Sequence, residues 1–200
     1  MITAQEAVDD LYRIAVTEES ATSTARLDLL ADFCVQEVDR RGLKDVEKEA
    51  TIPGGGREKK WDVAWQYEGK YRLGISLKSI LRNLPGTVPN RIDDMIGEVT
   101  NAQLYSPEIV IGYVMIFNIA EDNYSAKHDS TWCELFRKRA SSLSGRQPPS
   151  WTTGTVEDYL LMEVDFSAGS KIMRTSQQFD GFFNTLVEQV CLRNPKAISP

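Results

Sequence analysis

Residues 61–79 read WDVAWQYEGKYRLGISLKS, and this stretch decides the fold. The pair Glu68-Gly69 at its centre is typical of a tight turn between two β-strands. On either side the sequence is rich in β-branched and aromatic residues, which favour extended structure. The stretch therefore predicts an antiparallel hairpin, with one strand over residues 60–67 and the other over residues 70–79.

Polar residues interrupt the apolar pattern of both predicted strands. Alternate side chains of a strand share a face. Ser76 and Lys78 are thus expected on one face of the second strand, with the apolar residues beside them in the core. On the first strand Asp62 is expected on the face opposite Val63 and Trp65. The hairpin therefore places an acid near an amine on adjacent strands.

The hairpin lies within a longer alternation of helices and strands. Apolar residues at helical spacing predict helices before and after it, and alternating or continuous apolar runs predict further strands. The expected elements, besides the hairpin, are helices over 4–19, 23–41, 90–104, 130–143 and 179–193, and strands over 46–52, 109–118 and 156–166. Residues 81–89 are expected to form a loop. The order αβββαβ predicts an α/β fold with a mixed sheet, antiparallel in its first three strands and flanked by helices.

The bulk composition is that of one ordinary globular domain. Two hundred residues fit a single domain over 1–200, with a core over about 23–118 and a helix–strand–helix addition over 119–200. No apolar run approaches the roughly 20 residues needed to cross a bilayer, so a soluble, cytoplasmic protein without membrane contact is expected. The three cysteines are far apart, which favours neither a disulfide framework nor a zinc site.

Charge is unevenly distributed along the chain. The net charge is −6, which argues against a protein that coats nucleic acid by bulk attraction. Residues 57–91, however, hold eight Lys or Arg against three Asp or Glu, a local charge of +5. A basic patch of this kind can meet a phosphate backbone, although a solvated hairpin face is an equally good interpretation.

An acid and a lysine on neighbouring strands are the minimum that phosphodiester hydrolysis needs. The Asp62 carboxylate can hold a hard cation such as Mg²⁺ through its oxygens. Such a cation polarises a phosphate and lowers the pKa of a bound water. The Lys78 ammonium can place or activate that water and offset developing charge. The hairpin therefore predicts a hydrolytic site at Asp62 and Lys78.

Asp62, a gap of thirteen residues, and then Ser76-Leu77-Lys78 resemble the motif of the PD-(D/E)XK nuclease superfamily. The resemblance covers roughly residues 23–118 and implies a restriction-endonuclease-like αβββαβ core and a nuclease dependent on Mg²⁺ or Mn²⁺. Members typically carry a proline before the aspartate and an acid two residues before the lysine. This sequence has Trp61 in place of the proline and Ser76 in place of the acid. The serine at position 76 removes a metal ligand.

The resemblance also offers a replacement for that ligand. In one branch of type II restriction endonucleases the motif reads S-x-K, and the missing carboxylate comes from the following helix. Glu98 is the matching candidate here, with Asp94 second, because both share a helix face with Arg91 and Asn101. The opposing apolar stripe is expected to contain Ile92, Ile96, Val99 and Ala102. Glu37, on the helix before the first strand, is expected as a further metal ligand.

The implied activity is cleavage of double-stranded DNA by a homodimer. Arg82, Asn90, Arg91 and Lys60 are the expected DNA contacts. Ser76 is expected to hydrogen-bond a metal ligand or a metal-bound water. The three glycines at 54–56 are expected to form a flexible turn beside the groove, and 121–155 to hold recognition residues.

Plainer interpretations of the same residues stand beside these. Asp62 can be a surface acid paired with Lys60 or Lys78, a contact worth about 0–1 kcal/mol. Lys78 can be a strand lysine whose stem lies on apolar neighbours, and Glu98 can belong to an exposed helix face. The alternative function is a catalytically inactive nuclease-fold module for DNA binding or assembly, since Ser76 is not acidic.

Overall fold

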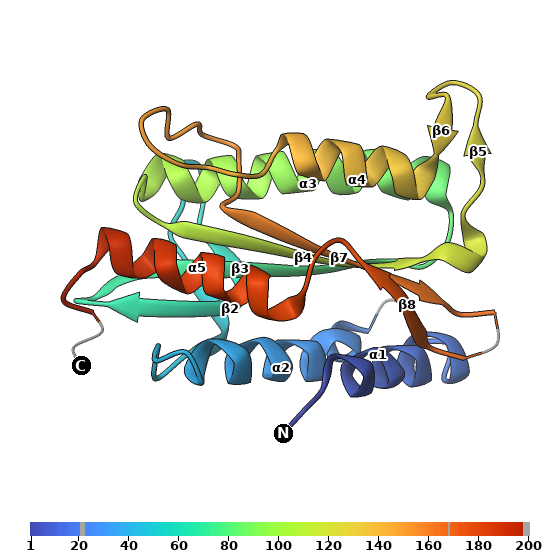
Figure 1. Cartoon of the computed structure of the whole chain (residues 1–200), viewed down its shortest axis with the longest axis horizontal. Coiled ribbons are helices and arrows are strands. Elements are labelled where there is room, and N and C mark those ends of the chain that lie inside the picture. The colour runs from blue at the N-terminus through green and yellow to red at the C-terminus, as the bar shows by residue number, and fades with distance from the viewer. Residues whose placement is uncertain (21–22, 168, 198–200) are drawn as a thin grey trace.

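A six-stranded mixed sheet forms the centre of the molecule (Figure 1). The structure, a computed structural model, describes residues 1–20, 23–167 and 169–197. Across the sheet the strands are β1 (Glu47–Ile52), β2 (Lys59–Tyr67), β3 (Lys70–Ile80), β4 (Val110–Asn118), β7 (Asp158–Asp165) and β8 (Lys171–Thr175). Strands β1, β2 and β3 are antiparallel, β3, β4 and β7 run parallel, and β8 is antiparallel to β7. The predicted mixed α/β sheet is confirmed.

Helices cover both faces of this sheet (Figure 1). One face packs against α3 (Leu84–Tyr105) and α4 (Trp132–Ser142). The other packs against α1 (Ala4–Tyr12), α2 (Asp28–Asp39) and α5 (Phe179–Arg193). The short elements are η1 (Arg13–Thr17), η2 (Thr24–Leu27), η3 (Ile119–Glu121), β5 (Tyr124–Ser125) and β6 (Ser130–Thr131). In the described ranges, no helix combines the length and apolar character that a membrane span requires.

The apolar run of β4 is explained by this two-sided cover. Every residue from Val110 to Asn118 is buried. Val114 and Ile116 pack into the core beneath α1, α2 and α5, while Tyr113 and Met115 pack into the core beneath α3 and α4. A central strand of a sheet with helices on both faces has no solvent side, so its sequence shows no polar alternation.

The loop expected over residues 81–89 is wrong, because α3 begins at Leu84. Pro85 lies in the first helical turn, where backbone N–H groups have no intrahelical partner and a proline costs no hydrogen bond. Pro89 lies one turn further on and removes only one such bond. Asn83, in the left-handed conformation with φ of 53°, provides the sharp entry into the helix.

The apolar stripe predicted for α3 is confirmed at Val99 and Ala102, and Ile92 packs against the same core, but Ile96 and Glu98 differ from the prediction. The buried stripe contains Met95, Val99 and Ala102, whereas Ile96 remains 38% exposed. Glu98, expected opposite the apolar stripe, is buried on the sheet side with these residues. The longer helix explains the difference, since its additional first turn buries Leu84 and Val88 and extends a stripe that passes through Met95.

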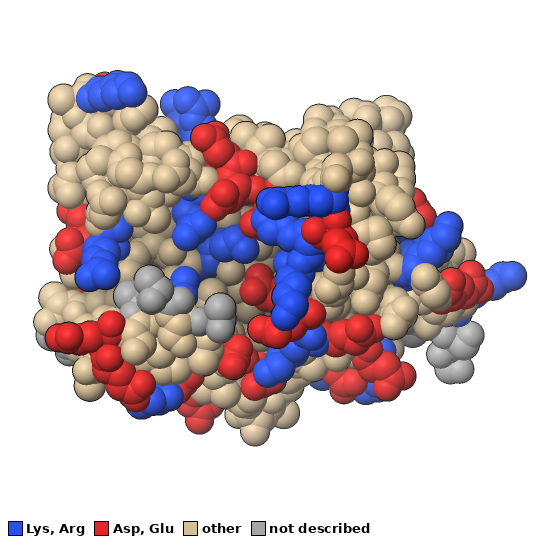
Figure 2. Space-filling view, turned by 180° about the vertical axis from the view of Figure 1, so that it is seen from behind, with Lys and Arg blue, Asp and Glu red and all other residues tan. Residues whose placement is uncertain are grey.

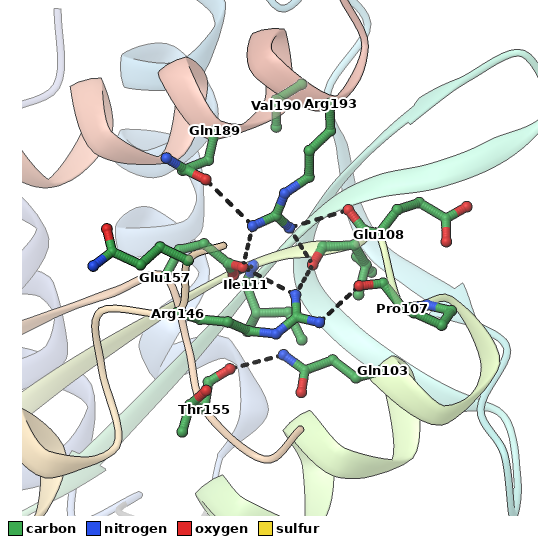
Figure 3. Close-up of polar contacts among 12 residues, drawn as sticks. Gln103, Pro107, Glu108, Ile111, Arg146, Thr155, Glu157, Gln189, Val190 and Arg193 are labelled. Carbon is green, nitrogen blue, oxygen red and sulfur yellow. Dashed lines mark hydrogen bonds and ion pairs between the residues drawn. The ribbon is translucent and has the colours of Figure 1, made fainter. Parts of the chain in front are cut away.

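A buried ion cluster ties the end of α5 to the sheet (Figure 3). The Glu157 carboxylate accepts hydrogen bonds from Arg146 at 3.1 Å and from Arg193 at 2.6 Å. Its second oxygen accepts the backbone N–H of Ile111 at 2.6 Å. The indole of Trp151 stacks on the Arg193 guanidinium, 4.4 Å from its ring centre. All three charged side chains are at most 7% exposed, so this cluster is part of the core.

Candidate active site

The regular alternation of β2 breaks at Asp62. Trp61 and Val63 are two residues apart and would share a face in a regular strand. Instead Trp61 packs beneath α3 and Val63 packs on the opposite face of the sheet. On β1, Glu49 adopts a left-handed conformation with φ of 52° at the point facing Asp62. In both β1 and β2, the side chains therefore change from one face of the sheet to the other at this position.

Because of this break, the Asp62 carboxylate reaches toward the backbone of β3. The register between β2 and β3 shifts once, between Trp65 and Gln66, and then continues to the pair Val63 and Ile75. After this pair, Asp62 Oδ2 accepts a hydrogen bond from the Leu77 N–H at 2.7 Å. The carboxylate thus takes the place that a backbone carbonyl of β2 would have in a regular pair of strands. The same oxygen lies 3.9 Å from Lys78 Nζ. The predicted proximity of Asp62 and Lys78 is thus present in the structure.

Glu98 of α3 completes the cluster from above the sheet. Ser76 Oγ donates to Glu98 Oε2 at 3.0 Å, and Lys78 Nζ lies 3.4 Å from the same oxygen. Lys59 Nζ donates to the other oxygen, Oε1. The Glu98 side chain is only 8% exposed. Asp94, the second candidate, pairs with Arg91 one turn earlier and has no contact with these groups among the described hydrogen bonds and ion pairs.

The two carboxylates differ in electrostatics. Burial raises the pKa of Asp62, and the opposing effects of Lys78 and the Leu77 N–H do not cancel it. Burial alone would also raise the pKa of Glu98, but Lys78, Lys59 and Ser76 together hold it below its usual value. The surroundings therefore favour the ionised form of Glu98 and disfavour the ionised form of Asp62. Two carboxylates face two ammonium groups, so the cluster is neutral without any bound ion.

The raised pKa of Asp62 predicts a pH-dependent gain from its removal. Between the pKa of the unfolded chain and the higher pKa of the folded protein, the folded state binds more protons, so stability falls as pH rises through this window. Asp62→Asn keeps an acceptor for the Leu77 N–H without the charge. We expect its free energy of unfolding, relative to wild type, to increase as pH rises from about 4 to 7 in urea titrations.

Asp93→Asn, an exposed change on α3, is the matched control for that measurement because it also removes one negative charge. It should show no comparable trend. A difference between Asp62→Asn and wild type that stays constant with pH would contradict the electrostatic explanation.

Two pockets lie along α3 beside the cluster. The first, of about 450 Å³, is lined by Gly56, Arg57, Lys59, Asp93, Asp94, Gly97, Glu98 and Asn101. The second, of about 410 Å³, is lined by Asn83, Gly86, Thr87, Asn90, Arg91, Asp93 and Asp94. They share two residues and so follow one side of the helix. Seen from behind, the molecule has Lys and Arg side chains gathered among Asp and Glu across the middle of its surface (Figure 2).

The four expected DNA contacts are spread over different surroundings. Asn90 and Arg91 line the second pocket. Arg82 is exposed and lines a different pocket, beyond the end of β3. Lys60 points away from Glu98 and pairs with Glu49 at 3.2 Å on the exposed surface of β1 and β2. Of these four residues, Asn90 and Arg91 therefore share a pocket on α3, and it meets the pocket of Glu98 at Asp93 and Asp94.

Glu37, the expected further metal ligand, is not brought into this cluster. Its carboxylate accepts hydrogen bonds from Arg40 at 2.7 Å and from Arg41 at 2.8 Å at the end of α2. Both arginines also pair with Asp180 of α5. Across residues 1–20, 23–167 and 169–197, no group of three or more His, Cys, Asp or Glu side chains is arranged to share a metal ion.

Two polar side chains of the site escaped the sequence analysis. Regular alternation from Val63 would put Lys59 and Trp61 on the face away from α3, and the break at Asp62 reverses this. The large apolar side chain of Trp61, which has to be buried, was the available signal. Tyr113 lies beside Ser76 in the parallel pairing of β3 and β4, a register that no local pattern reveals. Its hydroxyl is buried and has no hydrogen-bond partner among the described residues.

Asn101 fixes the glycine loop that borders the first pocket. Its side-chain oxygen accepts the N–H groups of Gly56 at 2.9 Å and Arg57 at 3.3 Å. Its amide nitrogen donates to the Arg57 carbonyl at 2.8 Å, and its backbone carbonyl accepts the Gly55 N–H at 2.8 Å. The turn expected at 54–56 is present beside the first pocket, and four hydrogen bonds, two of them made by Arg57, attach residues 55–57 to α3.

The geometry thus brings Asp62, Ser76, Lys78 and Glu98 together with Lys59, beside two pockets. Oxygen ligands from Asp62 and Glu98 are of the type that Mg²⁺ and Mn²⁺ prefer. Comparison of the chain with protein-family models, with curated proteins and with solved structures found no match, so its function is inferred from this geometry alone.

Proposed function

We propose that this chain is a metal-dependent endonuclease that hydrolyses DNA phosphodiester bonds, with a restriction-endonuclease-like core of the PD-(D/E)XK type. One observation carries the proposal. Carboxylates from two separate elements, Asp62 of β2 and Glu98 of α3, lie 3.9 and 3.4 Å from the same ammonium group, that of Lys78. A partly buried lysine between two acids whose pKa values are shifted in opposite directions, one of them lining a pocket, is an arrangement suited to hydrolysis.

The residues would divide the chemistry among them. Asp62 and Glu98 would hold a Mg²⁺ or Mn²⁺ ion, which when bound polarises the scissile phosphate and lowers the pKa of a water ligand. Lys78 would orient the attacking water and offset charge that develops on the phosphate. Ser76 would keep Glu98 in place through its 3.0 Å hydrogen bond, which explains how a serine can stand where the family usually has an acid.

Double-stranded DNA, a homodimer and a cytoplasmic location belong to the same proposal. Asn90 and Arg91 line a pocket on α3 that shares Asp93 and Asp94 with the pocket at Glu98, and they are suited to phosphate or base contacts. Arg82 and Lys60 are exposed and available to a longer stretch of duplex. A homodimer would allow a small enzyme to cut both strands of a symmetric site.

A second candidate is a catalytically inactive module of the same fold that binds DNA or assists assembly. The observation in its favour is the neutrality of the cluster. Both oxygens of Glu98 already have cationic partners, Lys59 on one and Lys78 on the other. A site of this kind is stable without a metal ion, as expected if the ion had been lost together with the usual acid at position 76.

Glu98→Ala separates the two candidates. For the enzyme, wild-type protein should nick or linearise supercoiled plasmid with Mg²⁺ or Mn²⁺, and Glu98→Ala should abolish cutting while circular dichroism shows an intact fold. Glu188→Ala, an exposed acid on α5, is the control and should cut as wild type does.

The other outcomes of this assay are also informative. A Glu98→Ala protein that still cuts would refute the idea that the α3 carboxylate replaces the missing acid. Wild-type protein that binds plasmid but does not cut it with either metal would support the inactive module.

A further inference from the structure

Lys59 holds the outer oxygen of Glu98. Its ammonium donates to Glu98 Oε1, while the inner oxygen, Oε2, is shared by Ser76 and Lys78. The Lys59 side chain is 31% exposed and lines the same pocket as Glu98 and Arg57. The side of Glu98 that faces solvent is therefore covered by a cation that belongs to the protein.

A divalent cation at Glu98 would meet unfavourable charge if Lys59 stayed. Asp62 and Glu98 together carry two negative charges, and Lys59 and Lys78 already balance them. Adding two positive charges within a few ångströms of both ammonium groups is repulsive even at a half-exposed site. One of the two lysines must therefore move away as the ion enters.

The structure indicates which lysine moves. Lys78 lies near both carboxylates, and its side chain is only 20% exposed. Lys59 has an ion pair with Glu98 alone among the described residues and opens onto a pocket of about 450 Å³. A flexible four-carbon stem can turn into that pocket at small cost. Lys59 is thus the cation that can be exchanged.

We propose that Lys59 neutralises the Glu98 carboxylate in place of a divalent cation and must leave it for the ion to bind, turning into the pocket beside Arg57. This inference rests on the proposed function, since it takes Asp62 and Glu98 as the ligands of the ion. Once displaced, Lys59 would lie beside Arg57 in a pocket that Asp93 and Asp94 also line, so acidic partners for its ammonium are available there.

Direct binding of Mn²⁺ tests this without any measurement of cleavage. Isothermal titration calorimetry would compare wild type with Lys59→Met and Lys60→Met. Lys59→Met should bind Mn²⁺ about tenfold more tightly, the order expected when one positive charge is removed a few ångströms from the ion at a half-exposed site. Lys60→Met is the matched control, because Lys60 is the adjacent residue, carries the same charge and pairs with Glu49 instead.

Each outcome has a definite meaning. Equal or weaker binding of Mn²⁺ by Lys59→Met would overturn the inference, as would an equal gain in Lys60→Met. If wild type binds Mn²⁺ but Asp62→Asn and Glu98→Gln bind it equally well, the ligands of the proposed function are wrong as well. Should the methionine variant fail to fold, Lys59→Gln removes the same charge and provides the same comparison.

Discussion

Lys78→Met should reduce metal-dependent cleavage of supercoiled plasmid by about 10³-fold, within the range of 10²–10⁴ for a positioned acid–base group. Methionine keeps most of the length and apolar stem of lysine, so the loss would report the ammonium itself. In the structure that ammonium lies within 4 Å of both Asp62 and Glu98. The measurement is the single-turnover rate of nicking at saturating Mg²⁺.

Lys70→Met is the matched control for this variant. Lys70 is on the same strand, β3, but is exposed at the hairpin turn. Its replacement should leave the nicking rate close to that of wild type. If Lys78→Met cuts as fast as Lys70→Met, the lysine has no part in the reaction and the proposed mechanism loses its central residue.

Glu157→Gln should cost about 3–5 kcal/mol in free energy of unfolding, the usual loss when a buried ion pair is broken on one side. The carboxylate is fully buried and is the anion between Arg146 and Arg193, which are 1% and 7% exposed (Figure 3). Without it, two guanidinium groups remain in the core with only neutral acceptors such as backbone carbonyls. Urea unfolding monitored by circular dichroism measures the change.

Asp32→Asn provides the comparison for Glu157→Gln. Asp32 pairs with Lys48 on the surface, where both side chains are more than a third exposed. Such a pair contributes about 0–1 kcal/mol. Similar losses in the two variants, with equal dependence on urea, would mean that the buried cluster does not stabilise the fold as its geometry suggests.

Local chemistry was sufficient to predict most elements of this fold. Glu68 and Gly69 both have positive φ, 51° and 71°, as the tight hairpin turn required. Helix α5 begins and ends where its apolar spacing predicted, at Phe179 and Arg193. Strand β8 was missed because an exposed edge strand such as Lys171–Thr175 has little apolar content to reveal it.

The candidate site was less accessible to such reasoning. Ser76 and Lys78 followed from strand alternation and a hairpin turn, both of which are local, whereas the contact of Asp62 with β3 depends on the break in β2. Glu98 lies in the cluster as expected, although it is buried with the apolar residues of α3 rather than opposite them. Lys59 depends on a break in two paired strands, which only the pairing itself shows. Tertiary contacts, rather than the local sequence, decide these positions.

The attachment of the glycine loop to α3 has a consequence for protein engineering. Exposed loop tips usually tolerate substitution and insertion. Here a Cβ atom added at Gly54 would lie 2.0 Å from Asn101 Nδ2, and one at Gly55 would lie 2.7 Å from Leu104 Cβ. Solvent accessibility is therefore a poor guide to which positions a mutagenesis library can vary. This segment should be held constant, as a core position would be, when the neighbouring pocket is redesigned.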